Sequence, residues 1–450
     1  MGYEKKEDYL QAVGQEIRWR PARRQLTREL SDHIADQEAD FLSQGMDPQE
    51  AARRAVEEMG DPVEVGQSMN QPHRPKRCFS LPILALCASF AGLVCCGQWM
   101  DFYDNKGNQL LGLGVGLVLM GLLWLADLPA ALKKLGRWVY GLVILCPLGV
   151  WTLFVLWPHH NSGVSSARFG LYLTLFFPLL FAALLLRLRG QGAWAVIAAS
   201  LAAAWLAMPP IQFPNIGTAA ILYGVMLFVL SAAVWNGWMG VKRRWLALPL
   251  LWTPGVLFLT AFFTSGLSTA RFTYFFHPEL DPTGYGYQWN TIRQTLDGLP
   301  FFFTSGALSP TQEAYLQSGL SHQSDFSLLT LTAQWGWVVM AVSLGVILLF
   351  GALALMRIRK LRSLSARLTA HAVVWTLLFQ ALLYWLAGFG YSPFYSMLPL
   401  PFFSYGPGFQ MTDLALLGVL LSAFRMDALW QDIAPPREPF RLPPSLLLPE

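Results

Sequence analysis

The residues that could carry out chemistry gather in one polar segment, from Ser265 to Asp325, between two apolar runs. It contains Arg271 and Arg293, and it ends with the carboxylate of Asp325. A carboxylate can accept a proton from a hydroxyl group, and guanidinium groups can stabilise negative charge that develops in a reaction. Long connections are usually functional or disordered, and the aromatic residues and turn signals of HPELDPTGYGYQ (His277 to Gln288) argue against disorder. We therefore expect any active or binding site here.

Asp325 also has a purely structural interpretation. The pair Ser324-Asp325 directly precedes an apolar run, which is a typical helix N-cap signal. Such a cap is worth about 1 kcal/mol of stability. The residues alone leave both interpretations open.

A metal site has little support in the sequence. His159, His160 and His322 are candidate ligands, but no cysteine or carboxylate lies at ligand spacing beside them. We expect no resident cofactor and no specific metal site, with a divalent cation as the open alternative.

The composition divides the chain into a charged head and a lipid-soluble body. Of the 450 residues, 54% are hydrophobic and 13% are charged, against roughly 25% charged in soluble proteins. Fifteen of the 28 acidic residues precede Cys78. The net charge is +4, and the excess basic residues lie in short loops between apolar runs. That pattern is typical of membrane topology and not of a nucleic-acid-binding surface.

Residues 1–77 predict a small soluble helical domain. We expect helices over 4–19 and 22–43, and a third that begins at Asp47-Pro48 and ends at Met59-Gly60-Asp61-Pro62. This head resembles the short helical prefix domains that precede permeases in some bacteria. We expect a regulatory or folding role for it.

The body predicts an all-α, polytopic membrane domain over residues 78–430. Ten apolar runs each approach the ~20 residues that cross a bilayer as a helix: 79–97, 109–128, 138–158, 169–187, 193–209, 217–236, 245–264, 326–356, 368–388 and 410–426. Thirteen basic residues lie in the loops on one side and four on the other. The positive-inside rule then places the head and the Pro-rich tail, 431–450, in the cytoplasm and the long loop 265–325 outside.

Several motifs follow one another in and after the long loop. Arg271 precedes HPELDPTGYGYQ, which contains Asp281, and LPLPFFSYG (Leu398 to Gly406) contains Ser404 and Tyr405. Between them come Arg293, Thr311-Gln312, Asp325 in QSDF, Gly336, Gln380, Gly390 and Pro393, with PNIGTA (Pro214 to Ala219) upstream. In order and spacing these motifs resemble the SEDS family of bacterial cell-wall polymerases, which includes RodA, FtsW and SpoVE. The resemblance covers about residues 165–428.

Departures from the family pattern fall at polar positions. Apolar or amide residues replace a glutamate, a lysine, an aspartate, a histidine and two further glutamates of the family motifs. The replacements are Leu180, Ala183, Asn215, Gln323, Ala333 and Gln334.

The resemblance implies a peptidoglycan glycosyltransferase in the bacterial plasma membrane, acting in cell shape, division or sporulation. Members of the family join lipid II units into glycan strands and release undecaprenyl pyrophosphate, and a class B penicillin-binding protein is the implied partner. Asp325 would be the general base. The implied substrate-binding residues are Arg271, Arg293, Asp281, Gln312, Ser404 and Tyr405. Two alternatives are a non-catalytic scaffold or regulator of a cell-wall complex and, less supported, a lipid-linked sugar transporter.

Overall fold

The computed structural model describes residues 6–73, 78–98, 106–156, 166–212, 215–242, 251–252, 273–302, 310–317, 326–392 and 398–427. Every regular element in these ranges is a helix, which confirms the predicted all-α class. Two candidate site residues, Arg271 and Asp325, lie outside the described residues, as do the tail 431–450 and nearly all of the predicted span 245–264.

The chain forms two compact units, of which the first contains residues 1–77. Its helices are α1 (Lys6–Glu16), α2 (Arg20–Ser43), α3 (Pro48–Glu57) and α4 (Pro62–Asn70). Tyr9, Val13 and Ile34 lie in their shared core, each at most 1% exposed. Asp47 caps α3 as predicted, through its side chain and the backbone N–H of Gln49.

Two boundaries in this unit differ from the prediction. The first helix ends at Glu16, before Trp19. Asp61-Pro62, predicted to end the third helix, instead begins the fourth, α4. The Asp61 carboxylate accepts hydrogen bonds from the backbone N–H groups of Val63 and Glu64, at 3.2 and 3.1 Å. An aspartate cap followed by proline is a helix start signal, so the helix end predicted at Asp61-Pro62 is wrong.

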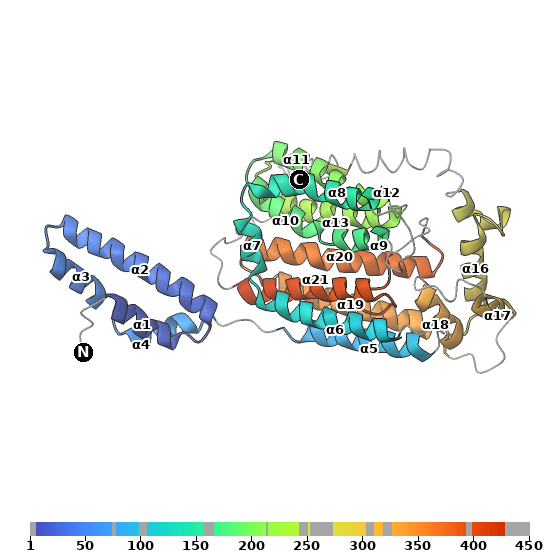
Figure 1. Cartoon of the computed structure of the whole chain (residues 1–450), viewed down its shortest axis with the longest axis horizontal. Helices are drawn as coiled ribbons and strands as arrows, with labels where there is room; N and C mark the ends of the chain where they lie inside the picture. The colour runs from blue at the N-terminus through green and yellow to red at the C-terminus, as the bar shows by residue number, and fades with distance from the viewer. Residues whose placement is uncertain are drawn as a thin grey trace, which may run out of the picture. The chain divides into compact units, whose positions relative to one another are not determined.

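The second unit is a bundle of long apolar helices (Figure 1). They are α5 (Ser80–Gln98), α6 (Lys106–Leu125), α7 (Leu128–Lys134), α8 (Trp138–Leu156), α9 (Ser166–Thr174), α10 (Phe177–Leu188), α11 (Ala193–Leu206), α12 (Pro209–Gln212), α13 (Ile216–Trp235), α18 (Ser327–Trp335), α19 (Val338–Ile358), α20 (Leu364–Gly388) and α21 (Pro407–Met426). In the described ranges seven helices could cross a membrane, or eight if α7 and α8, bent by 101°, form one span. Ser80–Val94 is a shorter apolar helix.

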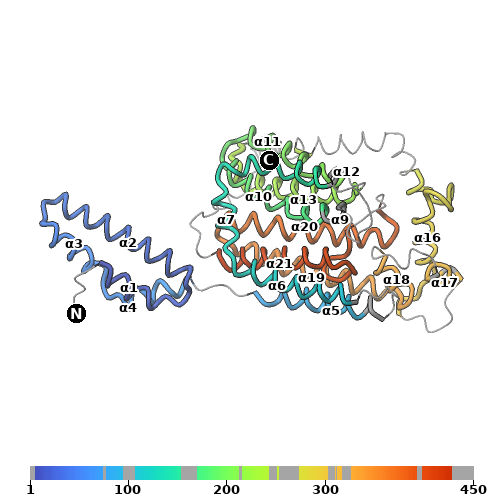
Figure 2. The backbone as a smooth tube through the Cα atoms, viewed as in Figure 1, coloured from blue at the N-terminus to red at the C-terminus, as the bar shows by residue number. Residues whose placement is uncertain are grey.

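The centre of this bundle is formed by α20 and α21. Figures 1 and 2 show these two helices between α10 and α13 on one side and α5 and α6 on the other. Helix α20 packs against α10, α13 and α19. The core of this unit is correspondingly aliphatic, with Leu222, Val374 and Leu420 fully buried.

The predicted span 326–356 is broken at Gly336, which separates α18 from α19. The backbone N–H groups of Trp337 and Val338 donate to the carbonyl oxygens of Pro300 and Phe301, at 3.1 and 2.9 Å. The first N–H groups of a helix have no partner within it. The chain at 300–301 therefore provides acceptors for the start of α19 and fixes the break.

Gly336→Ala is expected to lower the free energy of unfolding of the membrane unit by about 1–3 kcal/mol. Gly336 has φ +82°, and a Cβ there would lie 2.5 Å from the Pro300 carbonyl oxygen. Gly345→Ala in α19 is the control, because nothing lies within 4 Å of its Cβ position. Thermal unfolding in detergent measures both. Equal effects of the two substitutions would contradict this role for Gly336.

The long polar loop contains helices of its own. Its described part contains η1 (Pro278–Leu280), α16 (Tyr287–Leu296) and α17 (Pro310–Gln317). Figure 1 shows α16 and α17 near α18 at one end of the bundle. A buried cluster joins α16, α17 and α18, and it contains Ile292, Leu296, Leu299, Tyr315, Phe326, Leu329 and Ala333. The described part of the loop is therefore anchored to the membrane domain by apolar packing.

Candidate functional site

Asp281 organises the turn that carries the first motif of the loop. Its carboxylate accepts hydrogen bonds from the backbone N–H groups of Gly284 and Tyr285, at 3.0 and 2.8 Å. A Cβ at Gly284 would collide with this carboxylate, and one at Gly286 would collide with the Pro278 carbonyl oxygen. The glycines are thus required by close approach of the backbone. The structure places Asp281 in loop folding, because both carboxylate oxygens accept bonds from the turn.

The acidic residue nearest this turn, Glu279, is exposed. A hydrogen bond from its own backbone N–H, and then one involving the His277 ring at 3.1 Å, hold the pKa of Glu279 below its usual value. It therefore stays ionised at neutral pH and adds negative charge beside the Asp281 turn. It is not a candidate proton donor at that pH.

Arg293 on α16 holds two distant segments together. Its Nη2 donates to the carbonyl oxygen of Phe275 at 2.9 Å and to that of Gly390 at 3.4 Å. The guanidinium carbon lies 5.9 Å from the centroid of the Phe275 ring. Trp289, on the same helix, donates from Nε1 to the Ser392 carbonyl oxygen at 2.8 Å. Helix α16 therefore connects the segment that follows Arg271 to the end of α20.

Gln312 lies on α17 and is buried. The same helix is fixed to α18 by Tyr315, whose hydroxyl lies 2.9 Å from Thr330 Oγ1. Burial raises the pKa of Tyr315 far above its usual value, so the phenol stays neutral. Helix α18 begins at Ser327, directly after the segment that contains Asp325. Gln312 therefore lies on α17, which packs against α18, and α18 is the helix that follows Asp325 in the chain.

Ser404 lies in a buried hydroxyl cluster beside the start of α18. Its Oγ accepts from the Leu400 backbone N–H at 3.0 Å and lies 3.2 Å from Ser327 Oγ. Ser327 Oγ in turn lies 2.9 Å from the Tyr384 hydroxyl. The structure thus brings Ser404 against a residue only two positions after Asp325 in the chain. Tyr405 follows Ser404 and is half-buried.

Asp413 is a buried acidic residue that is not among the site residues predicted from the sequence. It lies on α21 and is 2% exposed. Its Oδ2 accepts a hydrogen bond from the Phe402 backbone N–H at 3.4 Å, and the Gln380 side chain on α20 lies beside the carboxyl group. Phe402 has φ +65°, a conformation that non-glycine residues rarely adopt. The signal that could have found Asp413 is its position inside an apolar run, where ionisable residues are usually functional.

A second polar contact fixes the other end of the 398–406 segment. Gln109 on α6 donates from Nε2 to Gln410 Oε1 at 2.8 Å and accepts from the Gly406 backbone N–H at 3.1 Å. Gln109 and Gln410 are both buried. Gln380 on α20 also donates to the Pro399 carbonyl oxygen. Side chains from α6, α20 and α21 therefore hold the segment that carries Ser404 and Tyr405.

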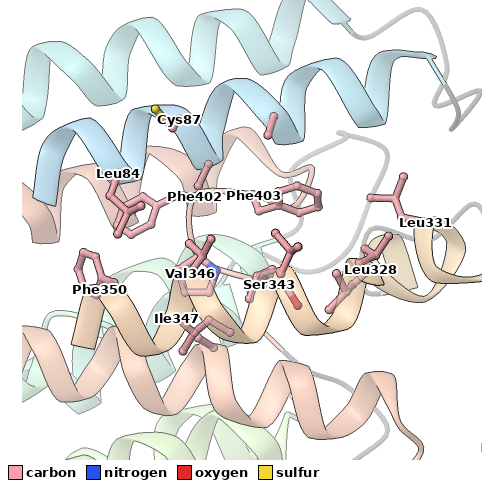
Figure 3. A pocket seen from close by; sticks show the side chains of 18 of the residues that line it. Leu84, Cys87, Leu328, Leu331, Ser343, Val346, Ile347, Phe350, Phe402 and Phe403 are labelled. Atoms are coloured by element: carbon pink, nitrogen blue, oxygen red, sulfur yellow. The ribbon is translucent and has the colours of Figure 1, made fainter. Parts of the chain in front are cut away.

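A cavity of about 650 Å³ borders the same segment (Figure 3). It lies between α5 and α19, and Phe402 and Phe403 contribute to its wall. The other labelled side chains are almost all apolar, among them Leu84, Val346 and Phe350. An apolar cavity of this size can take part of a hydrocarbon chain.

The departures from the family pattern are accommodated in the fold. Both Leu180 and Ala183 lie on α10, where Ala183 is in the main apolar core at 1% exposed and Leu180 is partly buried against that core. Ala333 is fully buried against the loop helices. Asn215 keeps the capping role that an aspartate would have, because its Oδ1 accepts from the Thr218 backbone N–H at 3.0 Å. Within the described residues no three His, Cys, Asp or Glu side chains are grouped to hold a metal ion.

The comparison with known proteins covers most of the chain. Residues 103–428 match the family model of cell cycle proteins that includes FtsW, RodA and SpoVE. No curated protein sequence matches. A chain in a structure of a peptidoglycan synthase complex, described as showing the structural coordination of polymerization and crosslinking, is similar at 22% identity and a TM-score of 0.59. The similarity covers 77% of this chain and 97% of that one.

Two structures of the rod shape determining protein RodA from Thermus thermophilus are also similar. One is the unmodified protein and the other has one aspartate replaced by alanine. Each has 20% identity and a TM-score of 0.51 over 78% of this chain, and the similarity covers 97% and 98% of the respective RodA chains. At this identity the structures support the fold.

Proposed function

This chain belongs to the FtsW, RodA and SpoVE family of cell cycle proteins, and we propose that it is a peptidoglycan glycosyltransferase that polymerises lipid II. As a polytopic helical protein of this family, it has a role in cell-wall synthesis. The proposal adds the reaction, its site at the outer face of the bacterial plasma membrane, and cytoplasmic termini. The observation that carries it is the match of Asp325 in QSDF to the family motif, with the buried Ser327–Ser404 contact directly beside it in the chain.

In the proposed reaction a sugar hydroxyl attacks the anomeric carbon of a lipid-linked glycan. The new glycosidic C–O bond forms as the bond to undecaprenyl pyrophosphate breaks, and the anomeric configuration inverts. Asp325 takes the hydroxyl proton as general base. Arg271 stabilises the pyrophosphate that leaves with the bonding electrons.

The remaining predicted residues have supporting roles in this proposal. Arg293 acts by holding Phe275, four residues after Arg271, against Gly390. Asp281 shapes the turn between these arginines, and Ser404 supports the start of α18. Gln312 and Tyr405 remain candidate substrate contacts. The apolar cavity beside Phe402 and Phe403 has suitable chemistry for part of the undecaprenyl chain.

A class B penicillin-binding protein is the proposed partner. A similar fold occurs in a peptidoglycan synthase complex in which polymerization and crosslinking are coordinated. A transpeptidase would crosslink the strands that this protein makes.

A non-catalytic scaffold is the second candidate function. The observation in its favour is that the partly buried Leu180 and the buried Ala183 pack in the apolar core at positions where the family has charged residues. Because both side chains are apolar, the bundle lacks the polar groups that the family has at these two positions. A scaffold would keep the fold and the partner surface without turnover.

Polymerisation of purified lipid II by the detergent-solubilised full chain tests the proposal. We expect glycan strands from the protein alone or with a co-expressed class B penicillin-binding protein that has an inactivated transpeptidase site. An active RodA under the same conditions is the positive control. If RodA makes polymer and this chain makes none in either arm, the enzyme proposal fails and the scaffold is favoured.

A further inference from the structure

A second cavity lies at the end of the bundle opposite the loop helices. It has a volume of about 330 Å³ and is formed where α13 and α19 end and α20 begins. Figure 1 shows this junction of α19 and α20 at the far end from α16 and α17. The lining residues are Asn236, Trp238, Leu355, Ile358, Arg359, Arg367, His371 and Trp375. The proposed reaction uses none of them.

The polar groups of this cavity are mainly hydrogen-bond donors. Two arginines line it, and none of its described lining residues is acidic. Arg367 donates from Nε and Nη2 to the Leu361 carbonyl oxygen, which fixes its guanidinium group at the start of α20. His371 Nδ1 accepts from Trp375 Nε1 at 3.3 Å, which assigns the proton of the neutral ring to Nε2 and makes that atom a donor. Two cations and a further donor around one hollow fit an anion.

An aromatic surface continues from the charged end of the cavity. Arg367, His371 and Trp375 are four residues apart on α20 and so share one face of the helix. The Trp375 ring packs on Phe228 of α13, with centroids 4.3 Å apart, and Phe228 packs on Phe379 at 6.0 Å. Phe228 is 37% exposed on a helix apolar enough to span a membrane. The cavity therefore joins an anion-binding end to a surface suited to hydrocarbon.

We propose that this cavity binds the phosphate headgroup of an anionic phospholipid, with an acyl chain along Trp375 and Phe228. Basic pockets between membrane helices on the cytoplasmic side bind phosphorylated headgroups, and the distribution of basic loops places this end of the bundle on that side. The aromatic surface favours a lipid over free phosphate, which has no hydrocarbon to bury. The site is independent of the proposed glycosyltransferase reaction.

Thermal unfolding of the purified full chain in dodecyl maltoside tests this site. Added phosphatidylglycerol is expected to raise the unfolding midpoint, because a ligand of the folded state stabilises it. Phosphatidylcholine and inorganic phosphate are expected to have little effect. An equal rise with inorganic phosphate would identify free phosphate as the ligand and overturn the lipid assignment. An equal rise with phosphatidylcholine would show that the phospholipid effect needs no anionic headgroup, and would also overturn it.

Two variants with the same change in charge locate the effect. Arg359→Gln removes a cation from the cavity, and Lys360→Gln removes one from the next, exposed residue, which does not line it. Native mass spectrometry should show about fivefold weaker phosphatidylglycerol binding for Arg359→Gln and near wild-type binding for Lys360→Gln. Equal binding by both variants and the wild type would overturn the proposal.

Discussion

Asp325→Asn is expected to abolish glycan polymerisation while the protein folds and unfolds as the wild type does. An asparagine side chain is isosteric with aspartate but cannot accept a proton at neutral pH. Loss of a general base lowers turnover by about 10²–10⁴-fold. Asparagine and aspartate are similar N-caps, so the competing structural role of Asp325 would survive the change. Initial rates of lipid II polymerisation and thermal unfolding in detergent separate the two roles.

The matched control is Asp297→Asn, which makes the same chemical change in the same loop. Asp297 is exposed at the end of α16, and its substitution should leave polymerisation unchanged. If Asp325→Asn retains wild-type turnover, Asp325 is not the base. If it loses stability and activity in parallel, its role is structural.

The apolar runs of the sequence predicted most of the fold because long hydrophobic segments have few alternatives to a membrane helix. The cap at Asp47 was also predictable from the sequence, because its hydrogen bond joins residues only two positions apart in the chain. The break at Gly336 was different. It depends on the carbonyl oxygens of Pro300 and Phe301, which belong to the loop. No property of the apolar run itself predicts that acceptors will be supplied from there.

In the candidate site, too, contacts between residues close in the chain were predictable and contacts between distant residues were not. The motif around Asp281 was readable because the turn closes on itself within five residues. Arg293 was assigned to substrate on sequence resemblance, whereas its Nη2 contacts are carbonyl oxygens 18 and 97 residues away in the chain. Asp413 was missed for a related reason. Its neighbours, Gln380 and Phe402, come from two other segments of the chain.

Asp413→Leu is expected to lower the free energy of unfolding by several kcal/mol, and Asp413→Asn to leave it nearly unchanged. In the described structure neither Asp413 Oδ1 nor Gln380 Oε1 has a hydrogen-bond partner, and both atoms are buried. One of the two N–H groups of Gln380 Nε2 donates to the Pro399 carbonyl oxygen, at 2.8 Å. Turning the amide around would therefore place two oxygens together. A proton on Asp413 Oδ1 would satisfy both acceptors if it were donated to Gln380 Oε1.

That proton would complete a chain of hydrogen bonds from Asp413 through Gln380 to Pro399. Phe402, which lies in the same 398–406 segment as Pro399, donates to Asp413 from its backbone N–H. Asparagine reproduces it, with its amide N–H facing Gln380 and its oxygen facing the Phe402 N–H. Leucine leaves both Gln380 Oε1 and the Phe402 N–H unpaired, at a cost of about 1–3 kcal/mol each. It also removes support from the unfavourable φ of Phe402. The control is Thr412→Val, whose lost bond to the Gly408 carbonyl oxygen lies within α21.

Thermal unfolding of the three variants in an ester-free detergent measures these differences. Infrared spectroscopy at neutral pH gives an independent reading, because a protonated carboxyl group has a C=O band that shifts in heavy water. We expect that band in the wild type and its loss in Asp413→Asn. Instability of Asp413→Asn equal to that of Asp413→Leu, with no such band in the wild type, would mean that Asp413 is ionised. The carboxylate would then have a cation as its partner, and sodium or potassium should stabilise the wild type but not Asp413→Asn.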